Sequence, residues 1–313
     1  MMITCLAGGT GAGKLLAGLV HVTDPKDITV IVNVGDDFML HGLYISPDLD
    51  TIMYTLANVA NSETGWGIAG ETWEVTQALE QYRGETWFKL GDKDLATHLY
   101  RTQRMTEGAT LSVITAELTG SWGIQTRLLP MSDDPVRTMI TLDTGGMNDT
   151  AKTEVAFQEY FVRLKHQVPI AKVRFSGVHQ ASPAPGVIKA LVQSDLIVVC
   201  PSNPIVSIGP ILAVDKISET LMQQREKVVA ISPIVNGMAL KGPADRMMKE
   251  LGHEPSALGV AKLYADWVKT MVVDTSDVGF APLIESLGMS CIVTQTVMSS
   301  LDLAVELGKA LLS

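Results

Sequence analysis

The sequence predicts an α/β protein built on a doubly wound, mostly parallel sheet. Strand-like and helix-like segments alternate along much of the 313 residues, as they do when crossover helices cover both faces of a sheet. Several strand-like segments, such as 195–200 and 227–232, are apolar and β-branched at consecutive positions. That pattern is typical of parallel strands that are buried on both sides.

The elements follow in order along the chain. The predicted strands are 2–6, 28–33, 124–130, 137–143, 170–175, 195–200, 227–232, 270–274 and 290–293. Helices are predicted near 184–193, 208–224, 243–250, 258–268 and 299–312. Segment 66–123 differs, because it holds three amphipathic stretches with no strong strand between them, namely 71–83, 92–104 and 110–119. We therefore expect one α/β domain over 1–313, with a helical subdomain at 66–123 inserted in it.

Composition limits the class of protein. Apolar residues make up 46% of the chain, enough for a sizeable core, and no apolar run reaches membrane-spanning length. Met1 and Met2 lead directly into the first strand, which leaves no room for a signal peptide. The net charge is −10 with no basic stretch, which argues against nucleic acid as a partner. A cytoplasmic protein without membrane contact is the expectation.

A glycine-rich turn joins the first strand to a helix. Gly8 and Gly13-Lys14 fit the phosphate-loop pattern G-x-x-x-x-G-K, but Leu15 stands where a Mg²⁺-binding Ser or Thr belongs. The dinucleotide pattern also fails, because its third glycine would fall at Lys14. We therefore predict that this turn binds phosphate in a Rossmann-like setting, but that it is neither an ordinary NTPase loop nor an ordinary dinucleotide loop. The alternative is a tight turn that binds nothing.

Four aspartates lie close to this turn in the sequence. Asp36 and Asp37 follow the second strand, and Asp48 and Asp50 precede a helix. One or two carboxylates together with substrate oxygens are the usual ligands of Mg²⁺. The alternative for Asp48 and Asp50 is helix capping alone, which needs only one such residue.

Two further groups of polar residues are candidates for nucleotide contacts. Asp94, His98 and Arg101 recur at i, i+4 and i+7 of a predicted helix and so share one face. Opposite an anion site, His98 and Arg101 could clamp a diphosphate. The alternative is a solvated face with an i,i+4 pair. Ser202 and Asn203 follow the strand that ends at Cys200 and suit ribose, phosphate or base, or else a rigid turn and helix cap.

Taken together, the motifs closely resemble the 2-phospho-L-lactate transferase family of coenzyme F420 biosynthesis. They are residues 8–16, 45–51, 89–94, 131–135 and 201–210, and the resemblance runs from the first residues to about 260. A related bacterial group binds UDP-sugars and regulates growth without turnover. It shares the glycine turn, and the block from Lys89 to Asp94 argues against it here.

The resemblance implies a Mg²⁺-dependent enzyme, a transferase for substituted phosphate groups. Its substrates would be the deazaflavin Fo (7,8-didemethyl-8-hydroxy-5-deazariboflavin) and a guanosine diphosphate ester of a three-carbon acid. The ribityl hydroxyl of Fo attacks the phosphorus that carries the three-carbon group, GMP leaves, and F420-0 forms. The three-carbon acid stays open between phospholactate, phosphoenolpyruvate and 3-phosphoglycerate. Dimers are common among such enzymes, so a homodimer is expected.

The resemblance also implies roles for residues of this chain. Asp50 and Lys89 would contact Fo, with Asp50 near the attacking hydroxyl as metal ligand or weak base and Asp48 as its catalytic partner. Asp48 and Asp50, with Asp37, would hold the metal. Gly9, Thr10 and Gly11 would hold phosphates, and Ser202 and Asn203 the nucleotide. Apart from the resemblance, the turn pattern adds Lys14, and the shared helix face adds His98 and Arg101, to the predicted nucleotide and phosphate contacts.

Overall fold

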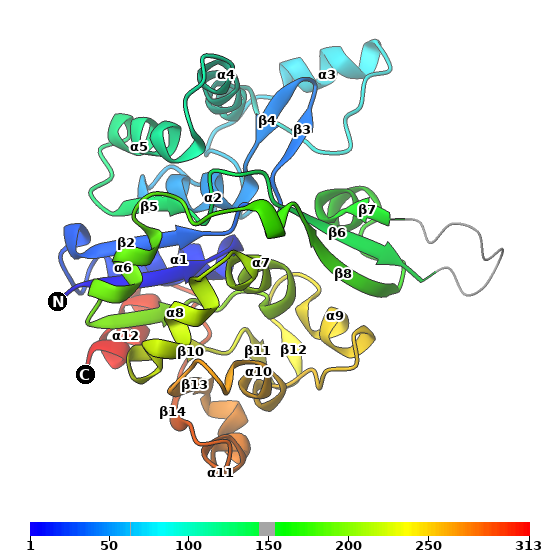
Figure 1. Ribbon diagram of the computed structural model, residues 1–313. Coiled ribbons are helices and arrows are strands. Elements are labelled where there is room, and N and C mark those ends of the chain that lie inside the picture. Colours follow the sequence, from blue (N-terminus) through cyan, green and yellow to red (C-terminus); the bar gives the residue numbers. More distant parts are fainter. Residues whose placement is uncertain (63, 144–153) are drawn as a thin grey trace.

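A seven-stranded parallel sheet forms the centre of the molecule in the computed structural model, which describes residues 1–62, 64–143 and 154–313 (Figure 1). In spatial order its strands are β14 (Ser290–Thr294), β13 (Thr270–Asp274), β10 (Val228–Ile231), β9 (Leu196–Val199), β1 (Ile3–Ala7), β2 (Ile28–Val32) and β5 (Arg127–Pro130). Every residue of β1 and β2 is buried, as their unbroken apolar sequences require. The predicted α/β fold class is confirmed.

The direction of the chain reverses at β1. From β1 the chain adds β2 and β5 on one side, then returns to place β9 on the other side and continues to β14. Cys5 therefore lies level with Val30 of β2 and Val198 of β9. In open parallel sheets a crevice forms at such a reversal, beyond the carboxyl ends of the strands. The loops after β1 and β9 meet there.

Helices flank the sheet in two groups. One contains α1 (Gly9–Leu19), α2 (Pro47–Leu56) and α12 (Leu301–Leu312), with α1 packed against both others. The other contains α6 (Val187–Gln193), α7 (Gly209–Ala213) and α8 (Ile217–Gln223). Right-handed crossovers that run in opposite directions along a sheet place their helices on opposite faces. Further along the chain come α9 (Ala244–Glu250), α10 (Ala257–Tyr264) and α11 (Ala281–Glu285), of which α11 packs on β14.

Three helices overlap the predicted stretches of segment 66–123. They are α3 (Glu74–Gln81), α4 (Asp92–Thr106) and α5 (Leu111–Ser121). α5 packs on β5, and α4 packs on a β-hairpin formed by β3 (Phe38–Leu40) and β4 (Leu43–Ile45). Those two short strands were not predicted from the sequence. The division of the chain into a domain and an inserted subdomain stays a prediction.

Two predicted strands belong to a different sheet. Segments 137–143 and 170–175 form β6 (Arg137–Leu142) and β8 (Ile170–Ser176), which pair antiparallel with each other and with β7 (Glu154–Ala156). Burial alternates along β6, which is the pattern of a sheet with one covered face. This small sheet lies beside the central one (Figure 1). A last hairpin pairs β11 (Ile234–Val235) with β12 (Met238–Ala239).

The predicted helix over 208–224 is divided in two. α7 ends at Ala213 and α8 begins at Ile217, with Lys216 between them at a φ of 64°. A left-handed backbone cannot continue an α-helix. Among the described helices, none combines the length and the apolar character that crossing a bilayer requires.

Candidate active site

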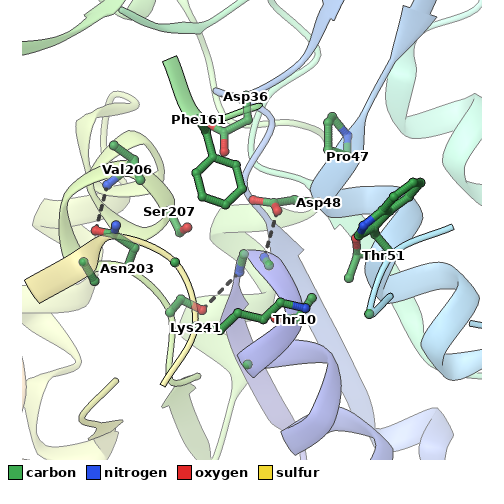
Figure 2. A pocket seen from close by; sticks show the side chains of 18 of the residues that line it. Thr10, Asp36, Pro47, Asp48, Thr51, Phe161, Asn203, Val206, Ser207 and Lys241 are labelled. Carbon is green, nitrogen blue, oxygen red and sulfur yellow. Dashed lines mark hydrogen bonds between the residues drawn. The ribbon is translucent and has the colours of Figure 1, made fainter. Parts of the chain in front are cut away.

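A cavity of about 800 Å³ lies at the reversal point of the sheet. It brings together most of the residues that the sequence singled out. Lining it are Gly9, Thr10, Gly11, Lys14, Asp48, Asp50, Lys89, His98, Ser202 and Asn203. Two predicted members, Asp37 and Arg101, do not line it. Figure 2 shows Thr10, Asp48 and Ser207, which come from three separate elements, around a common space.

The glycine turn is shaped by the loop that follows β9. A Cβ on Gly11 would lie 2.3 Å from the carbonyl oxygen of Pro201, and one on Gly8 would lie 2.7 Å from the Ser207 Cβ. Gly9 has a φ of 73°, in the left-handed region. These positions need glycine because of close packing and backbone conformation. Packing and backbone conformation therefore require these glycines whether or not the turn binds phosphate.

Two backbone amides of the turn are already used by side chains. The Gly8 amide donates to Ser202 Oγ over 3.2 Å, and the Gly9 amide donates to Asp48 Oδ1 over 2.8 Å. Thr10 and Gly11 follow in the first turn of α1, where amides lack intrahelical acceptors. The amides best placed for an anion are thus those of Thr10 and Gly11. The Gly9 amide, which was predicted to bind phosphate, already donates to Asp48.

Asn203 serves as a helix cap. Its Oδ1 accepts from the amides of Ile205 (2.9 Å) and Val206 (3.4 Å), at the start of the turn Pro204–Ile208. This is the turn-and-cap alternative of the sequence analysis. The side-chain amide nitrogen of Asn203 contacts only the sulfur of Met247, at 3.6 Å, among the described residues. A hydrogen-bond donor thus remains available at the cavity wall.

Two buried carboxylates meet at the cavity floor. Asp48 accepts from Gly9 and, over 2.9 Å, from Asn33 Nδ2. Burial raises the pKa of Asp48 to about 6. Burial, followed by repulsion from Asp48 and Asp37, raises the pKa of Asp36 well above its ordinary value. Asp36 Oδ1 has no hydrogen-bond partner in the part of the chain that the structure describes.

Asp36 and Asp48 fit the donor set of a divalent cation. Both line the cavity, both are buried, and no cationic side chain is among the groups that shift their pKa values. Two carboxylates without a positive partner are costly to bury, and a cation between them would remove that cost. Mg²⁺ is held by such carboxylates together with substrate oxygens. The orphaned Asp36 oxygen is the observation that supports this fit.

Of two adjacent aspartates, Asp36 lines the cavity and Asp37, which was predicted to hold the metal, does not; the metal role of Asp37 stays a prediction. Asp37 is 1% exposed, does not line the cavity and accepts from Ser46 Oγ over 2.8 Å at Oδ2, while its Oδ1, like that of Asp36, has no hydrogen-bond partner in the part of the chain that the structure describes. Burial raises its pKa to about 7, although Arg137 opposes that shift. Asp36, which was weighed but not selected, faces the cavity instead (Figure 2). Both residues lie in a turn after β2, where the alternation of a strand does not tell which one points inward.

Asp50 is paired with Arg101. Arg101 donates to Asp50 Oδ2 over 3.1 Å through one guanidinium nitrogen and contacts Oδ1 through another. Arg101 is only 1% exposed. The structure does not favour the predicted contact of Arg101 with a diphosphate, because its guanidinium does not line the cavity and already binds Asp50. Asp50, Asp94 and His98 have ligand atoms within 4.8 Å of one another, but the adjacent Arg101 supplies the positive charge that a metal would bring.

Aromatic and basic side chains complete the cavity, and most of them were not predicted. Trp87 and Phe88 precede Lys89 in the sequence, Trp66 comes from an earlier loop, and Phe157 and Phe161 come from the segment around the helical turn Glu159–Arg163. Phe161 stacks between Phe157 and His166. Lys165 and Lys241 also line the cavity. No spacing rule marks these positions, since they come from loops that only the fold brings together.

The fold and the cavity define an α/β enzyme for phosphate-bearing substrates. Its glycine turn begins a helix at the reversal of a parallel sheet, and carboxylates, lysines and aromatic rings face the same space. Residues 3–284 match the family model of CofD, 2-phospho-L-lactate transferase. The chain belongs to this family and is a transferase.

Relatives of known name match over their whole length. The phosphoenolpyruvate transferase of Streptomyces coelicolor is 42% identical over 100% of this chain and 98% of that protein. The 2-phospho-L-lactate transferase of Methanocaldococcus jannaschii is 37% identical over 98% and 96%. A crystal structure of a protein from Bacillus halodurans superposes with a TM-score of 0.62 at 18% identity, covering 100% of this chain and 99% of that one. That likeness shows the fold alone.

Proposed function

We propose that this enzyme transfers a phospholactyl-type group from a guanosine diphosphate ester to Fo. The terminal ribityl oxygen of Fo forms a bond to the phosphorus that carries the three-carbon group. The bond from that phosphorus to the bridging oxygen breaks, GMP leaves with that oxygen, and the Fo hydroxyl proton is released. The product is the phosphodiester F420-0 or its enolpyruvyl or phosphoglyceryl analogue.

The single observation that supports this proposal most is that one cavity contains both hydrogen-bond donors for a diphosphate and a pair of buried carboxylates. Gly11, Thr10 and Lys14 offer donors for a diphosphate, and the Asp36–Asp48 pair lies directly beside the turn. Charge develops on phosphoryl and leaving oxygens during such a transfer, so positioned donors supply much of the catalysis. The names of the relatives, which are transferases for phospholactate and phosphoenolpyruvate, agree with this use.

The acceptor is proposed to lie against Lys89 and Asp50. Lys89 is exposed at the cavity wall, and Trp87 and Phe88 precede it with rings that suit a flat heterocycle. Asp50 already accepts from Arg101 at both oxygens. Its remaining lone pairs are proposed to accept a hydrogen bond from the ribityl hydroxyl, which orients that hydroxyl toward phosphorus.

Mg²⁺ is proposed as the cofactor, with Asp36 and Asp48 as the residues that would hold it. When bound it would neutralise negative charge on the diphosphate. Asp48 also keeps the glycine turn in place, since it accepts a hydrogen bond from the Gly9 amide. Asp50 is left out of this set because its charge is balanced by Arg101.

The test is product formation with each possible donor. Purified enzyme is incubated with Fo, Mg²⁺ and the lactyl, enolpyruvyl or phosphoglyceryl ester of guanosine diphosphate, and products are identified by mass spectrometry. One of the three is expected to give GMP and the matching phosphodiester. Binding of a UDP-sugar without turnover of any ester would instead favour a nucleotide-sugar-binding regulator. The same preparation, examined by light scattering, tests the proposed homodimer.

A further inference from the structure

Three polar side chains of α4 are buried at the cavity wall, where Asp94 and His98 line the cavity and Arg101 does not. Asp94, His98 and Arg101 are 7%, 2% and 1% exposed, and they share one face of the helix. Their shared helix face predicted that His98 and Arg101 clamp a diphosphate. Their partners in the structure are protein groups instead, and these partners point to another role.

Arg101 connects α4 to α2 and to the β3–β4 hairpin. Its guanidinium binds both carboxylate oxygens of Asp50. The nitrogen that donates to Asp50 Oδ2 also lies 3.4 Å from the Tyr44 carbonyl oxygen and 3.2 Å from His98 Nδ1. A planar guanidinium that is fixed at several points holds a carboxylate in one orientation. Asp50 is thus oriented by a group that the cavity does not reach.

The neighbours of His98 determine its tautomer. Arg101 can only donate, so His98 Nδ1 must accept from it and the proton of a neutral ring lies on Nε2. Nε2 lies 3.3 Å from Asp94 Oδ1, which also accepts from the Tyr54 hydroxyl over 2.6 Å. Although burial raises it, contact with His98, Tyr54 and Arg101 keeps the pKa of Asp94 below its ordinary value.

His98 Nδ1 and the Asp50-facing nitrogens of Arg101 therefore face protein partners, whereas His98 Nε2 lies near Asp94 Oδ1 without a hydrogen bond to any described residue. The charges point the same way. Lysines already line the cavity with the glycine turn, and the positive charge of Arg101 is balanced by Asp50. A diphosphate could reach this guanidinium only by displacing Asp50. The geometry does not favour the clamp.

We propose that Asp94, His98 and Arg101 are positioning residues that hold Asp50 for the acceptor and do not bind the nucleotide. Asp94 orients His98, His98 orients Arg101, and Arg101 orients Asp50. This inference rests on the proposed function, because Asp50 is the group placed against Fo. Its consequence is specific: damage to this network weakens use of Fo and leaves use of the guanosine ester unchanged.

The test compares two changes at His98. His98→Gln keeps one acceptor and one donor at nearly the same reach, whereas His98→Leu keeps the volume and loses both. Steady-state kinetics are measured for Fo and for the ester separately, with melting temperatures to correct for folded fraction. His98→Leu is expected to raise the KM for Fo by about tenfold or more, the loss typical of a hydrogen bond to a charged group. His98→Gln should restore most of that loss, with an unchanged pH profile.

Arg104→Gln is the matched control. Arg104 lies on the same helix and pairs with Glu107 and Glu117 on a side that does not line the cavity. Its kinetics should equal those of the wild type. A rise in the KM for the ester, or a His98→Gln variant as impaired as His98→Leu, would overturn the proposal. The first result would make His98 a nucleotide ligand, and the second would require its imidazole to touch substrate or carry a proton. Failure of the proposed function is a separate outcome, seen as no turnover by the wild type.

Discussion

Asp50 combines two roles in one side chain. It faces the cavity where the acceptor is proposed to bind, and it is the counter-ion of Arg101, which is 1% exposed. Removing one member of a buried ion pair leaves the other charge without compensation. Substitution of Asp50 therefore changes stability as well as activity, and the two effects have to be measured separately.

Asp50→Asn is expected to lower the free energy of unfolding by about 3–5 kcal/mol, the usual cost of breaking a buried pair. Urea denaturation measures this change. The double variant Asp50→Leu with Arg101→Met should recover most of the stability, because apolar side chains of similar volume replace the pair. Equal stability of Asp50→Asn and the wild type would show that the charge of Asp50 is not what compensates Arg101.

Lys89 offers a cleaner test of the acceptor site, because its side chain is exposed and makes no ion pair among the described residues. Lys89→Ala is expected to raise the KM for Fo by about ten- to hundredfold, as when a hydrogen bond to a charged group is lost. The KM for the ester should stay nearly constant. Steady-state titration of each substrate measures both.

Lys93→Ala is the control for this change. Lys93 is exposed, four residues along the chain, and donates to the Ala69 carbonyl oxygen outside the cavity lining. It should show wild-type kinetics. An ester KM that rises with Lys89→Ala would assign Lys89 to the diphosphate of the donor, where a point charge is equally suitable.

At the scale of elements, the glycine turn depends on how its helix is packed. α1 lies against α12 with Gly18 at the contact, where an added Cβ would lie 2.3 Å from the Ala304 carbonyl oxygen. The backbones of the two helices approach too closely for any side chain. The position of α1, and with it the anion-binding turn, thus depends on a helix from the opposite end of the chain.

Gly18→Ala is expected to lower the free energy of unfolding by about 1–3 kcal/mol, because the cost of overpacking exceeds the gain in helix propensity. Gly120→Ala in α5 is the matched control, since an added Cβ there meets nothing within 4 Å. It should stabilise the protein by up to about 1 kcal/mol. Thermal unfolding of both variants checks the pair, and the argument fails if both changes stabilise.

The loops after β13 and β14 are joined by one carboxylate. Asp274 accepts from the amide and hydroxyl of both Ser276 and Thr296. Burial opposes its ionisation, but these four donors keep the pKa of Asp274 below its ordinary value. Thr296 lines the cavity, so this carboxylate supports one wall of the site.

The pH dependence of stability follows from that lowered pKa. A carboxylate with a lower pKa in the folded state stabilises the protein above its unfolded pKa, about 3.9, and loses that contribution as pH falls through the folded value. Asp274→Asn should therefore be less stable at pH 7 and should lose less stability on acidification. Denaturation at pH 7 and at pH 3 measures the difference between the two proteins. Parallel pH curves would show that Asp274 is not the group responsible.

At the scale of the whole molecule, the sequence predicted what depends on local pattern. Consecutive apolar residues predicted β1 and β9, glycines predicted the turn, and helical spacing placed His98 and Arg101 on one face. Pattern does not tell what that face meets, and Asp50 lies 51 positions from Arg101. The choice between two adjacent aspartates in a turn, and the separate sheet of β6 and β8, likewise depend on long-range packing.

Transfer to Fo is the central claim, and one measurement tests it most directly. The enzyme is supplied with Fo, Mg²⁺ and the reactive guanosine ester in ¹⁸O-labelled water, and GMP, Fo and phosphodiester are quantified together by mass spectrometry. The account predicts one GMP and one phosphodiester for each Fo consumed, with no ¹⁸O in either product, because the attacking oxygen comes from Fo. GMP released without loss of Fo, together with ¹⁸O in the phosphate of the three-carbon acid, would show a hydrolase and contradict it.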